Sequence, residues 1–429
     1  MKYKVLDVSD KKRIKNAEHW QAEINQLYHP TGRLKQDSYH IVYSNGNSNT
    51  TKFTPILLKE WFYLLEKNGY LIIDYKPNQH LDFKKLEDLM WWLWRKQYQV
   101  IFHNEVSPKE KVRTVKDLEI FIMHHENYYS KNLDPKTHLP TPLATKIKAE
   151  TPNFLRFICK KLVTTQVLND SITKWTFGII TNGVRLDWIE QIIKSIKAQH
   201  IPHYEIILCG RYFDRPEKNI RYIPFNERDD KGWISRKKNL IVDAAQYENI
   251  CIIHDRLTFD KDWYQGMKDW GNCFEHLCCP QYYESARTND WLLHEKLPGV
   301  EFSFVSHLDF KDWDWNACQG GQFHLLKKSV VQQVYWNESY LWGRAEDVAL
   351  TNDLRSKGFI IRCNPKSTLN TLVYKFGKIP DVVYDAQRLS SRRVGNIKRV
   401  LARKLYTVMN ANQHILSTVK KITKNKFIE

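Results

Sequence analysis

Three polar side chains follow a buried apolar segment in the stretch ICIIHDR, residues 250–256. Asp255 is the carboxylate of the three, and a carboxylate at the end of a rigid strand can ligate Mg²⁺ or Mn²⁺, which in turn neutralises a diphosphate. His254 is a second candidate ligand because imidazole suits Mn²⁺, and Arg256 can contact phosphate directly. A strand-terminal turn with a local ion pair is the alternative, and this stretch leaves both open.

An acidic pair, Glu346 and Asp347, occurs in the stretch LWGRAEDVAL and opens a predicted helix. The partial positive charge of a helix N-terminus favours carboxylates there, which is a sufficient structural explanation. Trp342 and Gly343 just before the pair suggest in addition an exposed aromatic platform beside a base. A carboxylate held there can accept a proton from a sugar hydroxyl.

Glycines and tryptophans between these two motifs are further candidates. Gly320 and Gly321 precede an apolar segment, and paired glycines permit close approach of a ligand to the backbone. Trp313 and Trp315 lie in the polar stretch KDWDWN. They are candidate sugar-stacking platforms, and shielding of the fold from solvent is the alternative.

Strands and helices alternate from about residue 171, which predicts a mostly parallel, doubly wound sheet. In such sheets ligands lie beyond the carboxyl ends of the strands. His254, Asp255 and Arg256 lie at such an end, and Thr181, Asn182 and Gly183 lie at another. Apolar spacing predicts strands at 175–181, 204–210, 220–224 and 250–253, and helices at 185–199 and 234–246.

The periodicity divides the chain into four parts. Residues 1–130 form a small α/β unit, with a helix from residue 54, a strand at 70–75, a helix at 81–97 and a strand at 98–103. The range 131–170 is predicted to be a linker, because residues 130–153 are rich in Pro and Lys and show little periodicity. Residues 171–385 form the doubly wound domain, and residues 386–429 form a basic tail with helical spacing of its apolar residues.

Composition narrows the class of protein. The chain has 429 residues and a net charge of +18, and residues 386–429 contain eleven Lys or Arg and one acidic residue. Because that tail holds about half of the excess, the main body does not require a nucleic-acid partner. The eight scattered cysteines form no C-x-x-C pair, and neither a signal peptide nor a membrane span is evident, so we expect a cytoplasmic protein with reduced thiols. The tail fits a solvated helical face or a peripheral helix on an anionic membrane surface.

These motifs occur in an order that resembles one enzyme family. Residues 174–375 resemble the family 2 glycosyltransferases, which have the GT-A fold, a Rossmann-like nucleotide-binding domain. The resemblance implies that the loop of Thr181, Asn182 and Gly183 holds the nucleotide. The family's helix start matches SRKKN, which implies donor contacts from the side chains of Arg236, Lys238 and Asn239.

The same resemblance assigns the strand-end trio and the acidic pair. The family's Asp-x-Asp metal motif matches HDR, which implies that Asp255 and His254 are ligands of Mn²⁺ or Mg²⁺. The resemblance also implies that Arg256, Gly320 and Gly321 contact the donor. WGRAED also resembles the W-G-x-G-E-D of β-1,4-type galactosyltransferases. By that match Glu346 holds the acceptor and Asp347 is the base. The sequence departs from the family in lacking the second Asp and a late His, and near the uracil position it offers only Asp214.

The amino-terminal unit resembles the carboxyl-side half of a SAM-dependent methyltransferase in the stretch LLKEWFYLLEKNGYLIIDY. The glycine-rich loop that holds SAM is missing, so the resemblance implies a degenerate module. Such a module can bind a partner or an acceptor glycan, or support the structure.

We therefore expect an inverting glycosyltransferase that moves a sugar from a nucleotide-sugar donor, a UDP-sugar, to a hydroxyl of a glycan or glycolipid. The alternative is a non-catalytic glycan- or partner-binding protein on a decayed GT-A fold, since the signatures of both families are incomplete. A methyltransferase is a third hypothesis, which the missing glycine loop disfavours.

Overall fold

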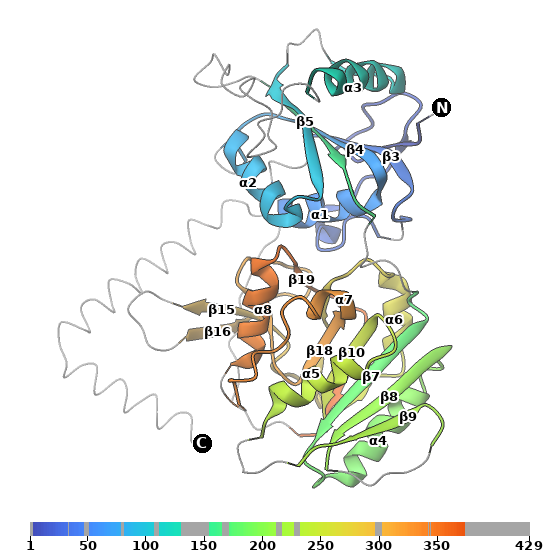
Figure 1. The fold of residues 1–429 in the computed structure, drawn as a ribbon, viewed down its shortest axis with the longest axis vertical. Helices are drawn as coiled ribbons and strands as arrows, with labels where there is room; N and C mark the ends of the chain where they lie inside the picture. The colour runs from blue at the N-terminus through green and yellow to red at the C-terminus, as the bar shows by residue number, and fades with distance from the viewer. Residues whose placement is uncertain are drawn as a thin grey trace, which may run out of the picture.

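The computed structural model describes residues 3–32, 34–46, 51–78, 81–106, 111–129, 154–164, 171–211, 217–226, 232–296, 303–341, 343 and 345–373. The chain forms two α/β domains stacked along the long axis of the molecule (Figure 1). The basic tail at 386–429 and most of the predicted linker lie outside the described residues.

The amino-terminal domain is built on one six-stranded sheet in the order β2-β1-β3-β4-β6-β5. Strands β1, β2, β3 and β4 run parallel, whereas β6 is antiparallel to both of its neighbours, β4 and β5. Its elements are β1 (Val5–Asp7), β2 (Glu18–His19), η1 (Ile24–Gln26), β3 (Tyr39–Asn45), α1 (Thr54–Leu64), β4 (Leu65–Tyr75), α2 (Phe83–Trp94), β5 (Tyr98–Glu105), α3 (Val115–Tyr129) and β6 (Leu155–Lys161).

Strand β6 corrects the predicted boundary of this domain. It lies inside the range 131–170 that the sequence predicts to be a linker, yet it pairs along its whole length with β4 and β5. Its sequence, LRFICKK, is short and mixes apolar with basic residues, so only its pairing with strands distant in sequence reveals a strand. The amino-terminal domain therefore extends at least to residue 161.

The carboxyl-terminal domain contains a seven-stranded sheet in the order β19-β12-β18-β10-β7-β8-β9. Strands β10, β7, β8 and β9 are parallel, and β18 runs antiparallel between β10 and β12. The strands are β7 (Lys174–Thr181), β8 (His203–Gly210), β9 (Ile220–Pro224), β10 (Asn249–His254), β12 (His276–Cys278), β18 (Phe323–Lys327) and β19 (Ile361–Cys363). The helices are α4 (Leu186–Lys197), α5 (Ile234–Ala244), α6 (Trp263–Trp270), α7 (Lys328–Val331) and α8 (Glu346–Ser356).

Two small sheets complete this domain, in the orders β11-β20-β13-β14 and β16-β15-β17. They are formed by β11 (Leu257–Phe259), β13 (Gln281–Tyr283), β14 (Ala286–Arg287), β20 (Leu369–Thr371), β15 (Trp291–Lys296), β16 (Ser303–His307) and β17 (Ala317–Gln319).

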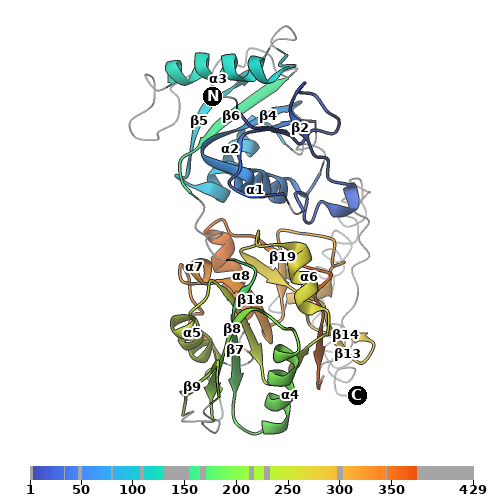
Figure 2. The same ribbon diagram turned by 90° about the vertical axis from the view of Figure 1, so that its right-hand side faces the viewer.

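The large sheet separates two hydrophobic cores because alternate side chains of a strand point to opposite faces. Phe177 and Ile179 of β7 pack with α4 and α6, whereas Ile180 packs with α5 and α8. Helices α4 and α5 accordingly lie on opposite sides of β7 and β8 (Figure 2). Gly178 lets α5 approach closely, since a Cβ there would lie 2.4 Å from Cγ2 of Ile241. The predicted fold class, α/β with a Rossmann-like GT-A domain, is confirmed by this sheet.

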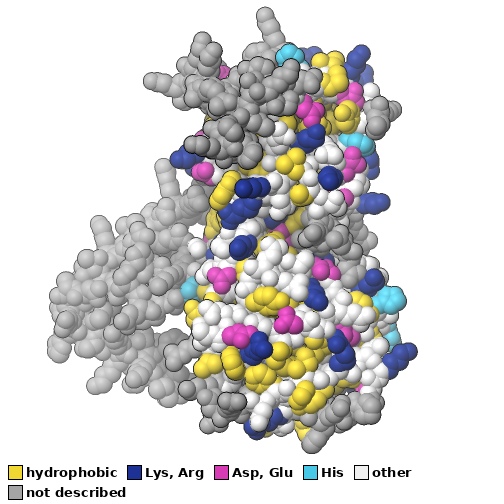
Figure 3. Space-filling model, viewed as in Figure 1, with side chains coloured by type: hydrophobic (Ala, Val, Ile, Leu, Met, Phe, Trp, Pro, Cys, Tyr) yellow, Lys and Arg dark blue, Asp and Glu magenta, His cyan; other side chains and the backbone are white. Residues whose placement is uncertain are grey.

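The surface carries charges of both signs, and the cysteines are buried inside the fold. On the face in Figure 3, Lys and Arg side chains are interspersed with Asp and Glu, and hydrophobic side chains gather over the lower end of the carboxyl-terminal domain. All eight cysteines are buried, and each is a thiol rather than half of a disulfide. In the described ranges, no helix is long and apolar enough to cross a membrane.

The two domains share one hydrophobic core. Helix α1 is buried on every side, and its Trp61 and Leu64 belong to the same cluster as Trp313 and Ile361 of the carboxyl-terminal domain. A helix that is buried on every side, with Lys59 and Glu60 among its buried residues, needs packing partners on every side. The docking of the second domain therefore completes the packing of the first.

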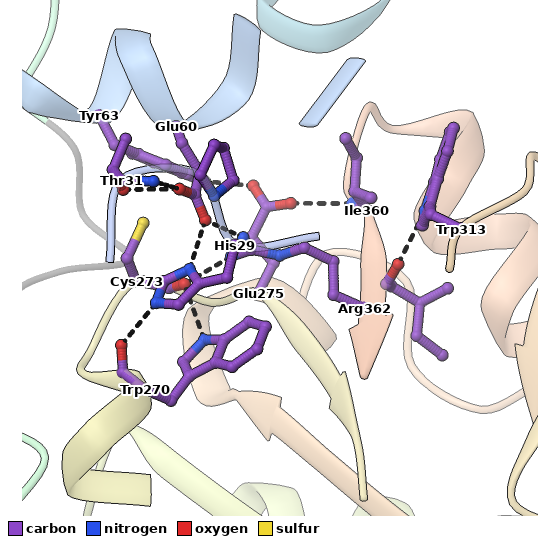
Figure 4. A network of polar contacts seen from close by, with 12 residues as sticks. His29, Thr31, Glu60, Tyr63, Trp270, Cys273, Glu275, Trp313, Ile360 and Arg362 are labelled. Carbon is purple, nitrogen blue, oxygen red and sulfur yellow. Dashed lines mark hydrogen bonds and ion pairs between the residues drawn. The ribbon is translucent and has the colours of Figure 1, made fainter. Parts of the chain in front are cut away.

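A network of buried charges crosses this junction (Figure 4). Glu60 of α1 pairs with Arg362 of β19, and it accepts hydrogen bonds from Thr31 and from His29, whose Nδ1 lies 2.8 Å away. Burial alone would raise the pKa of Glu60, but the charges of His29 and Arg362 lower it to about 2. Glu60 is therefore ionised at neutral pH and depends on these partners.

A second carboxylate lies beside the first. Glu275 accepts hydrogen bonds from the Tyr63 hydroxyl and from the backbone N–H of Ile360 at 2.8 Å, and it lies 2.9 Å from Lys59. Lys59 also donates to the carbonyl of Gly358 at 2.8 Å. Helix α1 thus holds both ends of the segment 358–362, through the Lys59 hydrogen bond to Gly358 and the Glu60 pair with Arg362.

Replacement of Arg362 tests the importance of this network. We expect Arg362→Leu to lower the free energy of unfolding by about 3–5 kcal/mol, because it leaves the Glu60 carboxylate buried without its cation. Lys366→Ala is the control, since that exposed lysine lies 3.7 Å from Asp269 and such a surface pair contributes at most about 1 kcal/mol. Urea unfolding followed by tryptophan fluorescence measures both, and equal losses would contradict a structural role of the network.

Candidate active site

The ends of β7 and β10 form the first half of the site. Ile180 pairs with His254 in the sheet, so Thr181 and Asp255 leave the two strands side by side. The Thr181 hydroxyl donates to Oδ2 of Asp255 at 2.8 Å and accepts from the Gly183 backbone N–H at 2.9 Å. The sheet therefore brings together both strand ends that the sequence predicts for the donor.

Positive side chains surround this strand end. Nη1 of Arg185 lies 3.6 Å from Oδ1 of Asp255, and Nζ of Lys237 donates to the Thr181 carbonyl at 2.9 Å. Burial, and then the positive charge of Arg185, lower the pKa of Arg256. A single carboxylate facing several cations leaves a surplus of positive charge, which suits a bound anion.

The acidic pair forms the second half of the site. Glu346 is 6% exposed, and its Oε1 lies 3.1 Å from Nζ of Lys238, which also donates to the Gly321 carbonyl at 2.9 Å. A Cβ on Gly321 would lie 2.6 Å from Oε1 of Glu346 and 3.3 Å from Oδ2 of Asp347. Glycine at 321 therefore lets the backbone lie directly against both carboxylates.

The carboxyl group of Asp347 has a raised pKa. It lies in the first turn of α8 and is only partly buried. Burial, and then the negative charge of Glu346, raise the pKa of Asp347 to about 6, although Lys238 acts in the opposite direction. A carboxylate with a pKa near the working pH is suited to accept a proton. Ala345, which precedes the acidic pair, has a left-handed φ of 56°, which is uncommon for a residue other than glycine and is found at functional sites.

Helix α5 joins the two halves. Its successive residues Lys237 and Lys238 reach the Thr181 carbonyl and Glu346, respectively. The backbone N–H of His254 also donates to the Gln322 carbonyl at 2.9 Å, next to Gly321. The strand-end cations and the acidic pair therefore border one region at the carboxyl edge of the sheet.

The predicted metal site is not supported by this geometry. No group of three or more His, Cys, Asp or Glu side chains that could hold a metal ion occurs in the part of the chain that the structure describes. Burial, and then the charges of Lys238, Arg256 and Lys237, hold the pKa of His254 well below its usual range. A divalent cation would meet one carboxylate and several positive charges. The residues around Asp255 and His254 therefore do not fit Mn²⁺ or Mg²⁺.

Two predicted donor contacts on α5 are engaged elsewhere. Arg236 Nη1 lies 2.9 Å from Oε1 of Glu338, and Asn239 Nδ2 donates to the same oxygen at 2.9 Å. Asn239 also bonds the backbone of Trp336 through both ends of its amide. These side chains hold the segment 336–338 against α5, which corrects the prediction that they face a nucleotide.

The remaining predicted residues have different surroundings. Asn182 accepts from the Val184 backbone N–H at 3.2 Å, which supports the turn. Gly320 lies against the backbone, since a Cβ there would be 2.2 Å from the Asn289 carbonyl oxygen. Trp342 and Asp214 lie outside the described residues.

The two tryptophans of KDWDWN differ in exposure. Trp313 is 3% exposed and donates its indole N–H to the Ile361 carbonyl at 3.1 Å (Figure 4), so it is a core residue and the prediction of an open stacking platform is wrong for it. Trp315 is 37% exposed. Trp313 therefore shields the core, which was the alternative to sugar stacking, and only Trp315 stays a candidate for stacking on a sugar.

Sequence reasoning missed two cations of the site, Arg185 and Lys237. Arg185 lies two residues past the predicted loop 181–183, at the N-cap position of α4, so its place just past a strand end was an available signal. Lys237 lies between two residues that the family pattern selects, and the pattern alone does not point to it. The directions in which the first turns of α4 and α5 face decide which groups Arg185 and Lys237 reach.

Solved protein structures match part of this chain at low sequence identity. A crystal structure of S. aureus TarS 1–349 matches 46% of this chain and 60% of its own length, with 13% identity and a TM-score of 0.34. Mannosyltransferase PcManGT from Pyrobaculum calidifontis, in complex with GDP-Man and Mn²⁺, matches 48% of this chain and 58% of its own length, with 12% identity and a TM-score of 0.34. No protein-family model and no curated protein sequence matches the chain. The chain thus spans about three fifths of the length of these two structures.

Removal of Lys238 tests the electrostatics of the acidic pair. We expect Lys238→Met to raise the pKa of Asp347 above its value of about 6, because the ammonium that favours the charged carboxylate is lost. Arg236→Met is the matched control, as it removes a cation two residues away that pairs with Glu338 instead. Carboxyl ¹³C NMR of protein labelled at Asp measures the pKa, and equal values in both variants would refute the assignment.

Proposed function

We propose that this protein is an inverting glycosyltransferase that moves a sugar from a nucleotide-sugar donor to a hydroxyl group of a glycan or glycolipid. The observation that supports the proposal most directly is the carboxyl of Asp347. It is partly buried, its pKa is raised to about 6, and it lies beside Gly321 at the edge where the strand-end cations gather. We take the donor to be a UDP-sugar on the resemblance of residues 174–375.

The donor half of the proposed reaction is electrostatic. Charge develops on the diphosphate as the bond to the anomeric carbon breaks, and fixed cations stabilise that charge. Arg185, Arg256 and Lys237 are placed to do so at the ends of β7 and β10. Asp255 orients this group through its contacts with Thr181 and Arg185. No metal ion takes part in this proposed step.

The acceptor half of the proposed reaction is proton transfer. Asp347 takes the proton of the acceptor hydroxyl while that oxygen bonds to the anomeric carbon, and the nucleoside diphosphate leaves with the electrons of the broken bond. One displacement inverts the anomeric configuration. Glu346 is fixed by Lys238 at 3.1 Å. It is therefore suited to hold the acceptor rather than to accept the proton of the acceptor hydroxyl.

The amino-terminal domain has a structural role in this proposal. Its α1 is buried against the carboxyl-terminal domain, and its charged residues reach the segment that follows α8. The resemblance of this domain to half of a methyltransferase, and contact of the tail at 386–429 with a membrane, remain predictions.

Substitution of the proposed base tests the reaction. We expect Asp347→Asn to lower kcat by about 10²–10⁴-fold, because an amide cannot accept the proton, while donor affinity is unchanged. Asp353→Asn is the matched control, since that residue is exposed on the same helix. Product release from UDP-, GDP- and CDP-sugars measures turnover, and calorimetry measures donor affinity. Wild-type turnover in Asp347→Asn would refute the assignment.

The pH profile provides a second test. We expect kcat/KM of the wild-type protein to fall below a pH of about 6, because protonation of Asp347 removes the base. The sign follows from the raised pKa, since the active form is the ionised carboxylate above that pH. A profile that is flat between pH 5 and 7 would contradict this role.

Chelation tests whether the proposed reaction requires a bound metal ion. We expect turnover to survive EDTA and Arg185→Met to weaken donor binding, because the arginine supplies charge to the diphosphate. Arg113→Met, at an exposed position of the amino-terminal domain, is the charge-matched control. Loss of turnover in EDTA that Mn²⁺ restores would return Asp255 to the role of a metal ligand. No turnover with any donor would favour the non-catalytic binding protein.

A further inference from the structure

An aromatic ridge, defined as Trp91, Trp92 and Trp315, crosses the junction between the domains. The rings of Trp92 in α2 and Trp315 in the carboxyl-terminal domain have centroids 4.8 Å apart. Trp91 is 58% exposed, and the guanidinium of Arg95 lies 4.3 Å from the centre of its ring. Large apolar rings that remain exposed on both sides of a junction mark a surface for a ligand.

A small cavity of about 10 Å³ opens beside this ridge, which is room for one hydroxyl group or one water molecule. Its lining includes Trp92, Trp313, His276, Asp314 and Arg355. Nδ1 of His276 is buried and has no hydrogen-bond partner among the described residues, whereas its Nε2 contacts the Gln319 amide at 2.6 Å. A buried ring nitrogen without a partner is a polar group that a ligand can satisfy.

The ridge and the proposed base lie along the same two elements. Thr351, Leu354 and Arg355 of α8 line the cavity, and Asp347 opens that helix. Eight residues of α-helix separate Asp347 from Arg355, which corresponds to about 12 Å. Strand β17 follows the same path, because Gly320 lies just past its end and the Arg355 guanidinium donates to the Ala317 carbonyl at 2.9 Å.

The position of the ridge is held by contacts between the domains. The backbone at Gly358, just past α8, lies against that of Trp92, since a Cβ on this glycine would be 2.3 Å from the Trp92 carbonyl oxygen. Arg95 also donates to the Ser356 carbonyl. Helix α2 accordingly lies close to α8 across the junction (Figure 1).

The chemistry of this surface favours a saccharide. Tryptophan faces offer a broad apolar surface to the C–H face of a sugar ring, and a few polar groups then fix its hydroxyls. Asp314 and Arg355 supply one charge of each sign, and His276 supplies an unpartnered nitrogen. The pKa of His276 is lowered to about 3 by burial and by Arg355, so its ring is neutral and suits an uncharged hydroxyl.

We propose that the aromatic ridge forms a distal subsite for the saccharide chain of the acceptor, about 12 Å from Asp347 along α8, with a single sugar hydroxyl directed into the small cavity beside the ridge. This inference rests on the proposed function, because it extends the same acceptor site. It assigns to the amino-terminal domain half of a substrate-binding surface, through Trp91 and Trp92. The acceptor is therefore an oligosaccharide rather than a single sugar.

A binding experiment tests the subsite without requiring transfer. The full chain carrying Asp347→Asn is applied to an array of immobilised mono- to hexasaccharides, so that no turnover alters the ligands. We expect retention of oligosaccharides but not of the matching monosaccharides. Adding Trp315→Ala should weaken retention about tenfold or more, since truncation of a central aromatic contact costs at least about 1.4 kcal/mol.

Two further variants separate loss of the platform from loss of the fold. Trp315→Phe keeps an aromatic face and should retain most of the binding, and Trp20→Ala removes an exposed tryptophan outside the ridge and should change nothing. Equal retention by the Asp347→Asn protein with and without Trp315→Ala would overturn the subsite, as would retention of no oligosaccharide at all. Turnover of donors by the wild-type protein is measured separately, so failure of the subsite is distinguishable from failure of the proposed function.

Discussion

The buried pairing of Glu60 with Arg362 and of Glu275 with Lys59 is the interaction on which the arrangement of the two domains depends. A buried charge is tolerated only when its partner is present, and here the partners of each pair come from different domains. Helix α1 is covered by the second domain on the side that its own sheet leaves free. The domains are therefore one packed unit, and each positions surface residues of the other.

This constraint reaches the candidate active site through α8. The helix begins at the acidic pair and ends just before Gly358, whose carbonyl accepts from Lys59. Its first turn faces Lys238 of α5, and its later turns line the cavity under the aromatic ridge. The orientation of one short helix thus connects the proposed base, the cation that holds Glu346 and the surface at the domain junction.

The charges of the site divide the proposed reaction between two neighbouring lysines. Lys237 lies with Arg185 and Arg256 at the strand ends, where a diphosphate requires positive charge, whereas Lys238 balances the acidic pair. Because both lysines extend from the same turn of α5, the spacing of the two halves is fixed by helix geometry. In this proposal the cations around Asp255 supply to the diphosphate the positive charge that a metal ion would otherwise bring.

The sequence by itself determined the alternating strands and helices, the strand ends that carry Thr181 and Asp255, and the acidic pair at the start of α8. These features follow from local periodicity and from the rule that ligands lie at the carboxyl edge of a parallel sheet. Only the tertiary structure decided that β6 belongs to the first sheet, that Trp313 is buried while Trp315 is exposed, and that Arg236 and Asn239 contact Glu338. Each depends on a partner distant in sequence, and local periodicity carries no information about which distant surface covers a side chain.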